Sequence, residues 1–250
     1  MRARNRPTSA WRLWPGLVPG LVAAAAAGAA SPQLPRHPAA PRPELAAVHA
    51  VWMADTIAPG ETLAIRITGI VGPNGSWTLS GIRQEPLPGS THGVLLRPAV
   101  ERVPGEMFIQ MEIPLDQVVR ILPGRGRNFE LCVAGRDTNV CARVRVRTTL
   151  RRQPAGVRLS RGTAMTSGTD EIVPLDVQAT IRSGWVAALE WSEGGTAARR
   201  VEDVQGDGAG LNGRVLVRRP LGDPARRITV KAIDGQGGRS APAVMTLPAR

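Results

Sequence analysis

One segment constrains the fold of this chain more than any other: FELCVAGRDTNVCARVRV, from Phe129 to Val146. A turn centred on Arg136 and Asp137 folds the segment back on itself and places Cys132 opposite Cys141. The same register pairs an acid with a base and brings apolar residues together on the other face: Glu130 with Arg143, Val133 with Val140, and Phe129 with Val144. This agreement at every pair predicts an antiparallel β-hairpin.

The facing cysteines predict a disulfide. Directly opposite residues of an antiparallel pair lie about 4.5 to 5.5 Å apart at Cα, which a disulfide can bridge. We therefore predict a Cys132–Cys141 disulfide, which fits an oxidising compartment, with two free thiols as the alternative. A zinc site is disfavoured because no second Cys or His pair lies at ligand spacing, so neither a metal nor another cofactor is expected.

The same hairpin predicts a row of exposed arginines. Its register directs Arg143, Arg145 and Arg147 outward, with about 6.8 Å between successive side chains. Arginines at this spacing can hold phosphate, sulfate or carboxylate groups through bidentate hydrogen bonds, which makes these three residues the candidate anionic-ligand face. The alternative is an ordinary solvated sheet face, neutralised in part by Glu130.

The rest of the chain predicts an all-β fold. Apolar residues alternate mostly with period two, and turns rich in Gly and Pro separate the candidate strands. These strands are Thr62–Thr68, Ser76–Leu79, Met107–Ile113, Phe129–Ala134 and Asn139–Arg147 in the first half, and Pro174–Ile181, Val186–Gly195, Gly213–Arg219, Arg227–Gly238 and Ala241–Leu247 in the second. Short strands at this spacing are typical of β-sandwiches.

The N-terminal residues 1–30 have the pattern of a secretory signal peptide. A basic start precedes an uncharged stretch that ends in small residues, so cleavage is predicted near Ala29 or Ala30. The alternative is a retained membrane anchor, which Pro15, Pro19 and the alanine run disfavour. We therefore expect an exported protein, periplasmic or extracellular, that contacts a membrane only if this segment is uncleaved.

The mature part is predicted to hold a linker and two domains. Residues 31–45 are rich in proline and predict an extended linker. The remaining roughly 205 residues exceed the usual size of one domain. We place the domains at residues 46–150 and 151–250, divided at the turn-rich RRQPAG.

The end of the second half resembles a known family. The segment ITVKAIDGQGGRSAPAVMTL is similar to the final hairpin of bacterial immunoglobulin-like domains: Asp234 and Gly237 match its turn, and Gly238 stands where the family usually has Asn. The first half, with APGETLAIRITG, is similar to immunoglobulin-like domains that open with a Pro-Gly-Glu strand. The resemblance implies two antiparallel immunoglobulin-like β-sandwich domains that act as a spacer, adhesion or polysaccharide-contact module.

Composition narrows the function classes. The net charge is +12 and Lys231 is the only lysine, which indicates either attraction to an anionic polymer or a coding bias in a soluble protein. Nucleic-acid binding is not expected, because two Phe, no Tyr and few Trp offer little for bases to stack on. Three histidines, His37, His49 and His92, form no nucleophile–base–acid pattern, so we expect no enzyme.

The expected function is therefore an exported, non-enzymatic structural or interaction protein of the bacterial cell envelope that contacts an envelope protein. The alternative is a carbohydrate-binding or anionic-glycan-binding module. Such a module would use the arginine row, or Trp185 as a platform for stacking on a sugar ring, with core packing as the other reading of that tryptophan.

Overall fold

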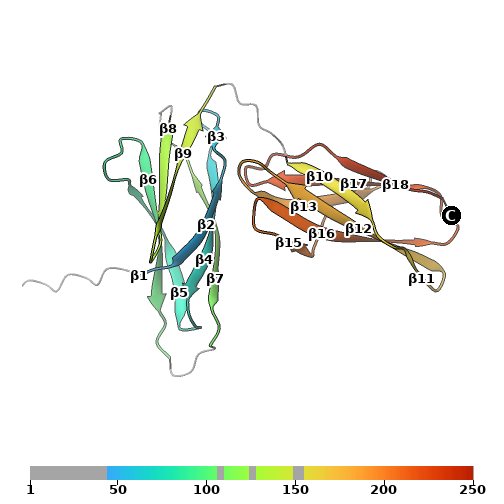
Figure 1. Ribbon diagram of the computed structural model, residues 1–250, viewed down its shortest axis with the longest axis horizontal. Helices are drawn as coiled ribbons and strands as arrows, with labels where there is room; N and C mark the ends of the chain where they lie inside the picture. The colour runs from blue at the N-terminus through green and yellow to red at the C-terminus, as the bar shows by residue number, and fades with distance from the viewer. Residues whose placement is uncertain (1–43, 106–109, 124–127, 149–154, 250) are drawn as a thin grey trace, which may run out of the picture. The chain divides into compact units, whose positions relative to one another are not determined.

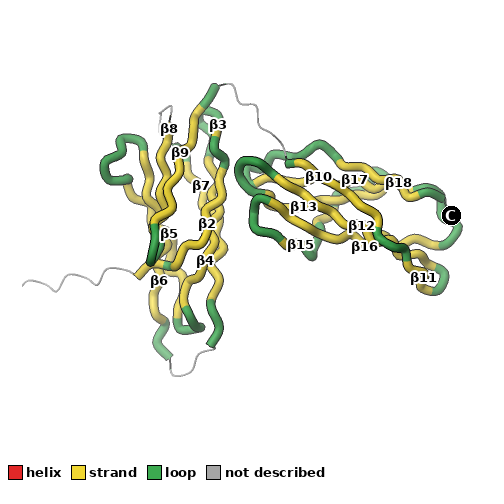
Figure 2. Tube along the Cα trace, in the orientation of Figure 1, coloured by secondary structure: helices red, strands yellow, loops and turns green. Residues whose placement is uncertain are grey.

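The computed structural model describes residues 44–105, 110–123, 128–148 and 155–249, which form strands and loops without a helix (Figure 2). The all-β prediction is thus confirmed. The predicted signal peptide, most of the predicted linker and the predicted domain boundary lie outside the described residues. Glu44 and Leu45, the last two residues of the predicted linker, form strand β1.

Residues 44–146 form two sheets that share one core, which we call the first sheet pair (Figure 1). Its strands are β1 (Glu44–Leu45), β2 (Ala47–Met53), β3 (Thr56–Ile57), β4 (Leu63–Gly72), β5 (Trp77–Pro86), β6 (Gly93–Arg102), β7 (Ile113–Ile121), β8 (Asn128–Ala134) and β9 (Asn139–Val146). One sheet has the order β1-β6-β8-β9-β3 with β5 along β6, and the other has the order β2-β4-β7.

Two strand pairs of the first sheet pair depart from the predicted antiparallel arrangement, because β6–β8 and β3–β9 are parallel. Between β6 and β8 the chain passes through β7, which lies in the other sheet. A parallel pair requires a crossover connection of this kind, since a short hairpin returns the chain antiparallel.

The core of the first sheet pair follows the period-two pattern. On β8, Leu131 and Val133 are fully buried, and on β4, Leu63, Ile65 and Ile67 are fully buried. All five belong to one cluster that draws side chains from both sheets. Burial of such side chains contributes about 1.5 to 3 kcal/mol each, which is why a slip of one residue in register is disfavoured.

In the first half, one predicted strand is wrong, and some of the observed strands, such as β6, were not predicted. Met107–Ile113 does not form a strand over its described part: residues 110–112 are loop, and Met111 is 59% exposed. The strand begins only at Ile113. Strand β6 was not predicted, and it contains Pro98. The proline is tolerated because it lies between the part of β6 that pairs with β8 and the part that pairs with β1.

Residues 156–247 form the second sheet pair, with a core of its own. Its strands are β10 (Gly156–Arg161), β11 (Met165–Ser167), β12 (Asp170–Thr180), β13 (Val186–Glu193), β14 (Arg199–Arg200), β15 (Val204–Gln205), β16 (Gly210–Pro220), β17 (Arg226–Asp234) and β18 (Ala243–Leu247). One sheet has the order β10-β12-β16-β15 with β11 along β12, and the other has the order β14-β13-β17-β18. Every strand pairing described in these two sheets is antiparallel.

A buried ion pair lies at one end of the core of the second sheet pair. Glu171 of β12 is directly opposite Arg219 of β16, and each is 1% exposed. Arg219 Nε donates to Glu171 Oε2 over 2.8 Å, and its NH1 donates to the carbonyl oxygen of Pro248 over 2.6 Å. Arg161 of β10 lies 3.9 Å from the other carboxylate oxygen. The pair therefore ties β12, β16 and the end of the chain together.

The turn between β17 and β18 forms where the resemblance placed it. The Asp234 carboxylate accepts hydrogen bonds from the amides of Gln236 and Gly238, over 2.9 and 2.7 Å. Gly237 has a φ of 84°, a backbone conformation that favours glycine. A Cβ on Gly238 would crowd the Asp234 carboxylate, which gives a local reason for glycine at that position.

Candidate functional site

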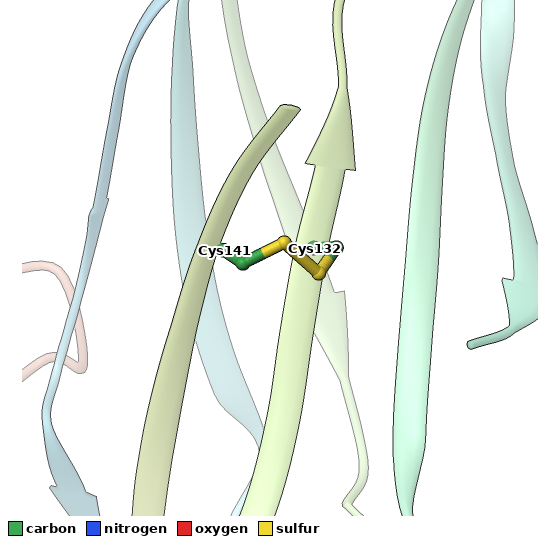
Figure 3. Close-up of a disulfide and its surroundings, with 2 residues drawn as sticks. All are labelled: Cys132 and Cys141. Atoms are coloured by element: carbon green, nitrogen blue, oxygen red, sulfur yellow. A yellow bond between two sulfur atoms is a disulfide. The ribbon is translucent and has the colours of Figure 1, made fainter. Parts of the chain in front are cut away.

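The β8–β9 hairpin carries the candidate site, and its register is the predicted one. Cys132 pairs with Cys141, Glu130 with Arg143 and Phe129 with Val144. The Gly135 amide donates to the Thr138 carbonyl over 2.7 Å, which closes the turn. The predicted disulfide is formed, with 4.1 Å between the Cα atoms, and it links the two neighbouring strands (Figure 3).

The two cysteines have unequal surroundings. Cys132 is 5% exposed and packs in a small second cluster with Leu95 and Ala134, against which Leu45 and Leu87 also pack. Cys141 is exposed on β9. The outer face of this sheet is therefore apolar and covered around Cys132 and Ala134 of β8, and open to solvent over β9. The disulfide joins the covered part to the open part.

The arginine row lies on the open part. Arg143 and Arg145 are exposed residues of β9, and Arg147 is exposed just beyond the end of that strand. Among the described residues, none of the three forms an ion pair with a carboxylate; Glu130, although directly opposite Arg143, is not within ion-pair distance of it. Three guanidinium groups thus remain available to an anion from solution.

Many other arginines of the chain are engaged by carboxylates. Arg66 donates from Nε and NH2 to the two carboxylate oxygens of Asp116, over 2.8 Å each. These hydrogen bonds hold the pKa of Asp116 below its usual value and raise the pKa of Arg66. Hydrogen bonds to Glu193 and Asp223 likewise raise the pKa of Arg226. The row on β9 differs because no such partner lies beside it in the described structure.

The net charge of the chain does not explain the arginine row. The described residues hold 21 of the 32 Lys and Arg and 19 of the 20 Asp and Glu, a net charge of +2 from 21 − 19. Most of the +12 therefore belongs to residues outside the described part. Anion binding is therefore inferred from the local arrangement of Arg143, Arg145 and Arg147 and not from a basic surface in general.

Trp185 does not offer a ring for sugar stacking in this structure. It lies just before β13 and is 8% exposed. The ring packs closely on Gly235, where an added Cβ would overlap it. Trp191 of β13 is half-buried against the core, with the Arg199 guanidinium 5.8 Å from its ring centroid. The burial of Trp185 fits core packing, the other interpretation of this tryptophan.

The described residues contain no group of three or more His, Cys, Asp or Glu side chains that could hold a metal ion. His49 lies exposed on β2, and His92 lies exposed in the loop before β6. His37 lies outside the described residues. Between β15 and β16, the Asp207 carboxylate accepts a hydrogen bond from the Gly210 amide over 3.3 Å.

Comparison with known protein families finds no matching family model, and comparison with curated proteins finds no significant match. Within the described ranges no helix is long and apolar enough to span a membrane.

Proposed function

We propose that this chain is an exported, non-enzymatic interaction protein of the bacterial cell envelope, built on immunoglobulin-like domains. The observation that carries the proposal is the row of exposed arginines, none of them paired with a described carboxylate, on a disulfide-linked hairpin. A disulfide fits an oxidising compartment outside the cytoplasm. The leader pattern of residues 1–30 supports export independently.

The strand order of the second sheet pair supports an immunoglobulin-like assignment. In such domains the strands are divided into the groups ABED and CFG, to which variants add C′. The order β10-β12-β16-β15 corresponds to A-B-E-D, and β14-β13-β17-β18 corresponds to C′-C-F-G. The first sheet pair departs from this order, because β6 lies between β5 and β8 and pairs in parallel with β8. The assignment therefore rests mainly on the second sheet pair.

Export is tested by intact-protein mass spectrometry of the protein produced in a bacterial host with its leader, run with and without reductant. We expect a secreted species that lacks the residues up to Ala29 or Ala30. Its mass should rise by two hydrogens on reduction of the Cys132–Cys141 bond. A full-length, already reduced chain retained in the cytoplasm would contradict the proposed compartment.

A second candidate function, binding of an anionic glycan, is favoured by the same arginine row. We expect the triple variant Arg143→Ser/Arg145→Ser/Arg147→Ser to bind a sulfated polysaccharide about tenfold more weakly or worse, since each arginine lost removes a charge-assisted hydrogen bond. Wild-type binding should weaken steeply as salt rises, because exposed charges are screened.

Arg83→Ser is the matched control for this measurement. Arg83 is exposed on β5 of the same sheet and is not part of the row. Its replacement should leave the affinity for the polysaccharide nearly unchanged. Affinity that does not respond to salt, or that falls equally in the control, would remove the row from the binding site.

A further inference from the structure

Strand β9 is covered unequally along its two edges. One edge pairs with β8 from Asn139 to Arg145. Among the described strands, the other edge pairs only with β3, which is two residues long. On that edge the Arg145 amide donates to the Asp55 carbonyl over 2.8 Å, and the Arg147 amide donates to the Ile57 carbonyl over 3.0 Å. Within the described residues, the first half of β9 therefore pairs with a strand on one side only.

The backbone groups that face this open half follow from strand geometry. Successive residues of a strand direct their N–H and C=O groups to alternate edges. Because Arg145 and Arg147 point toward β3, Asn139, Cys141 and Arg143 present their backbone groups to the same edge. No hydrogen bond from a described residue reaches them there. Unpaired groups of this kind are what an added strand binds.

Three other edge strands carry features that block strand addition. Strand β5 has an irregular register at Leu79–Gly81 and ends at Pro86. Strand β7 contains Pro114, and β18 lies between Pro242 and Pro248. Bulges and prolines protect edges against pairing. The Asn139–Arg143 stretch of β9 has neither, and the disulfide at Cys141 holds it against β8 in advance of binding.

The side chains beside this edge indicate what kind of strand it can accept. Arg143, Arg145 and Arg147 stand on the open face, and no described carboxylate is paired with them. A second copy of β9 would bring another arginine row alongside, and like charges opposite each other destabilise a strand pair. A strand with acidic residues at every second position would instead place its carboxylates beside the guanidinium groups.

We propose that the open half-edge of β9 receives a short, extended, acidic segment of a partner protein as an added strand. The backbone of the segment pairs with Asn139, Cys141 and Arg143, and its carboxylates meet the arginine row at Arg143, the member of the row that lies on the open half. This inference rests on the proposed role as an interaction protein and names the partner class for it. Affinity comes from main-chain hydrogen bonds and selectivity from the charges.

The test uses the full mature chain and a capped eight-residue peptide of alternating glutamate and threonine. Two derivatives of the peptide are N-methylated, one at the glutamate amides and the other at the threonine amides, so that each loses its donors along one edge. We expect the parent peptide to bind in isothermal titration, and one derivative to bind at least tenfold more weakly while the other retains most of its affinity. Amide hydrogen exchange at Asn139, Cys141 and Arg143 should slow on binding.

Variants locate the binding site on the chain. Arg143→Gln should weaken peptide binding several-fold, whereas Arg83→Gln, on the far strand of the same sheet, should not. If both methylated peptides bind as tightly as the parent and the three amides gain no protection, strand addition is overturned, while charge-driven binding to the row survives. If a sulfated polysaccharide binds the row and the peptide does not, the partner is a glycan and the inference fails. If neither ligand binds, the inference and the proposed function fail together.

Discussion

Replacing Arg219 with methionine is expected to destabilise the second sheet pair by about 3 to 5 kcal/mol. Arg219 and Glu171 are both 1% exposed, and Arg219 NH2 lies 2.6 Å from the carboxylate in addition to the Nε hydrogen bond. Without the guanidinium, the buried carboxylate loses the partner that lies directly opposite it, and the Arg161 guanidinium is 3.9 Å away. Removing one partner of a buried ion pair is far more costly than the loss of an exposed pair.

The chain supplies a matched control for this substitution at the next residue. Arg218 pairs with Asp170 on the outer face, where its side chain is 70% exposed. Arg218→Met should therefore cost less than about 1 kcal/mol. Urea unfolding of the full chain, followed through the amide resonances of β12 and β16, measures both effects.

A double replacement distinguishes the contribution of the whole ion pair from the cost of removing one of its partners. Glu171→Met/Arg219→Met should recover most of the stability lost in Arg219→Met, because apolar side chains of similar volume leave no unpaired charge in the core. If Arg219→Met costs no more than Arg218→Met, the ion pair has no structural role. If the double variant is the least stable of the three, the ion pair stabilises the fold by more than the mutual compensation of its two charges.

Removal of the disulfide is expected to cost about 2 to 3 kcal/mol. The bond joins residues nine apart in the sequence, and closing so short a loop removes modest entropy from the unfolded chain. The Cys132→Ala/Cys141→Ala variant should lose this amount relative to the oxidised wild type, as measured by urea unfolding of the first sheet pair. Added reductant should lower the stability of the wild type and leave the double variant unchanged.

The surroundings of Cys132 predict a further asymmetry in that experiment. Cys132 packs with Leu95 and Ala134, whereas Cys141 is exposed. In a Cys141→Ala background, serine at position 132 should be less stable than alanine, because its hydroxyl would be buried among apolar side chains. Equal stability of the two would mean that the small cluster over β8 is not closed to water in solution.

Local pairing is the part of this fold that the sequence predicts well. The hairpin from Phe129 to Val146 folds back through a short turn. The alternation of its apolar residues, its opposite charges and its two cysteines all favour the same register, and the structure has that register. The Asp234 turn is likewise local, since its carboxylate caps amides only two and four residues away. In both places the partners lie within a few residues along the chain.

Prediction was poorer where a strand departs from simple alternation. Strands β6 and β7, which were not predicted, contain Pro98 and Pro114, and each proline lies where its missing N–H is tolerated in its sheet. In the Met107–Ile113 segment, which was predicted to be a strand, residues 110–112 are loop and only Ile113 belongs to one. Alternation shows that a segment could form a strand, but a neighbouring strand must be present to pair with it.

The sequence by itself determined the all-β class, the hairpin register, the disulfide and the outward direction of Arg143 and Arg145, because these follow from period-two alternation between nearby residues. Only the tertiary structure decided which distant strands become neighbours. It placed β6 parallel to β8, buried Glu171 opposite Arg219, and left half of β9 open because β3 is only two residues long. Such contacts depend on long-range packing, whose partners are far apart in the chain and therefore leave no local pattern to read.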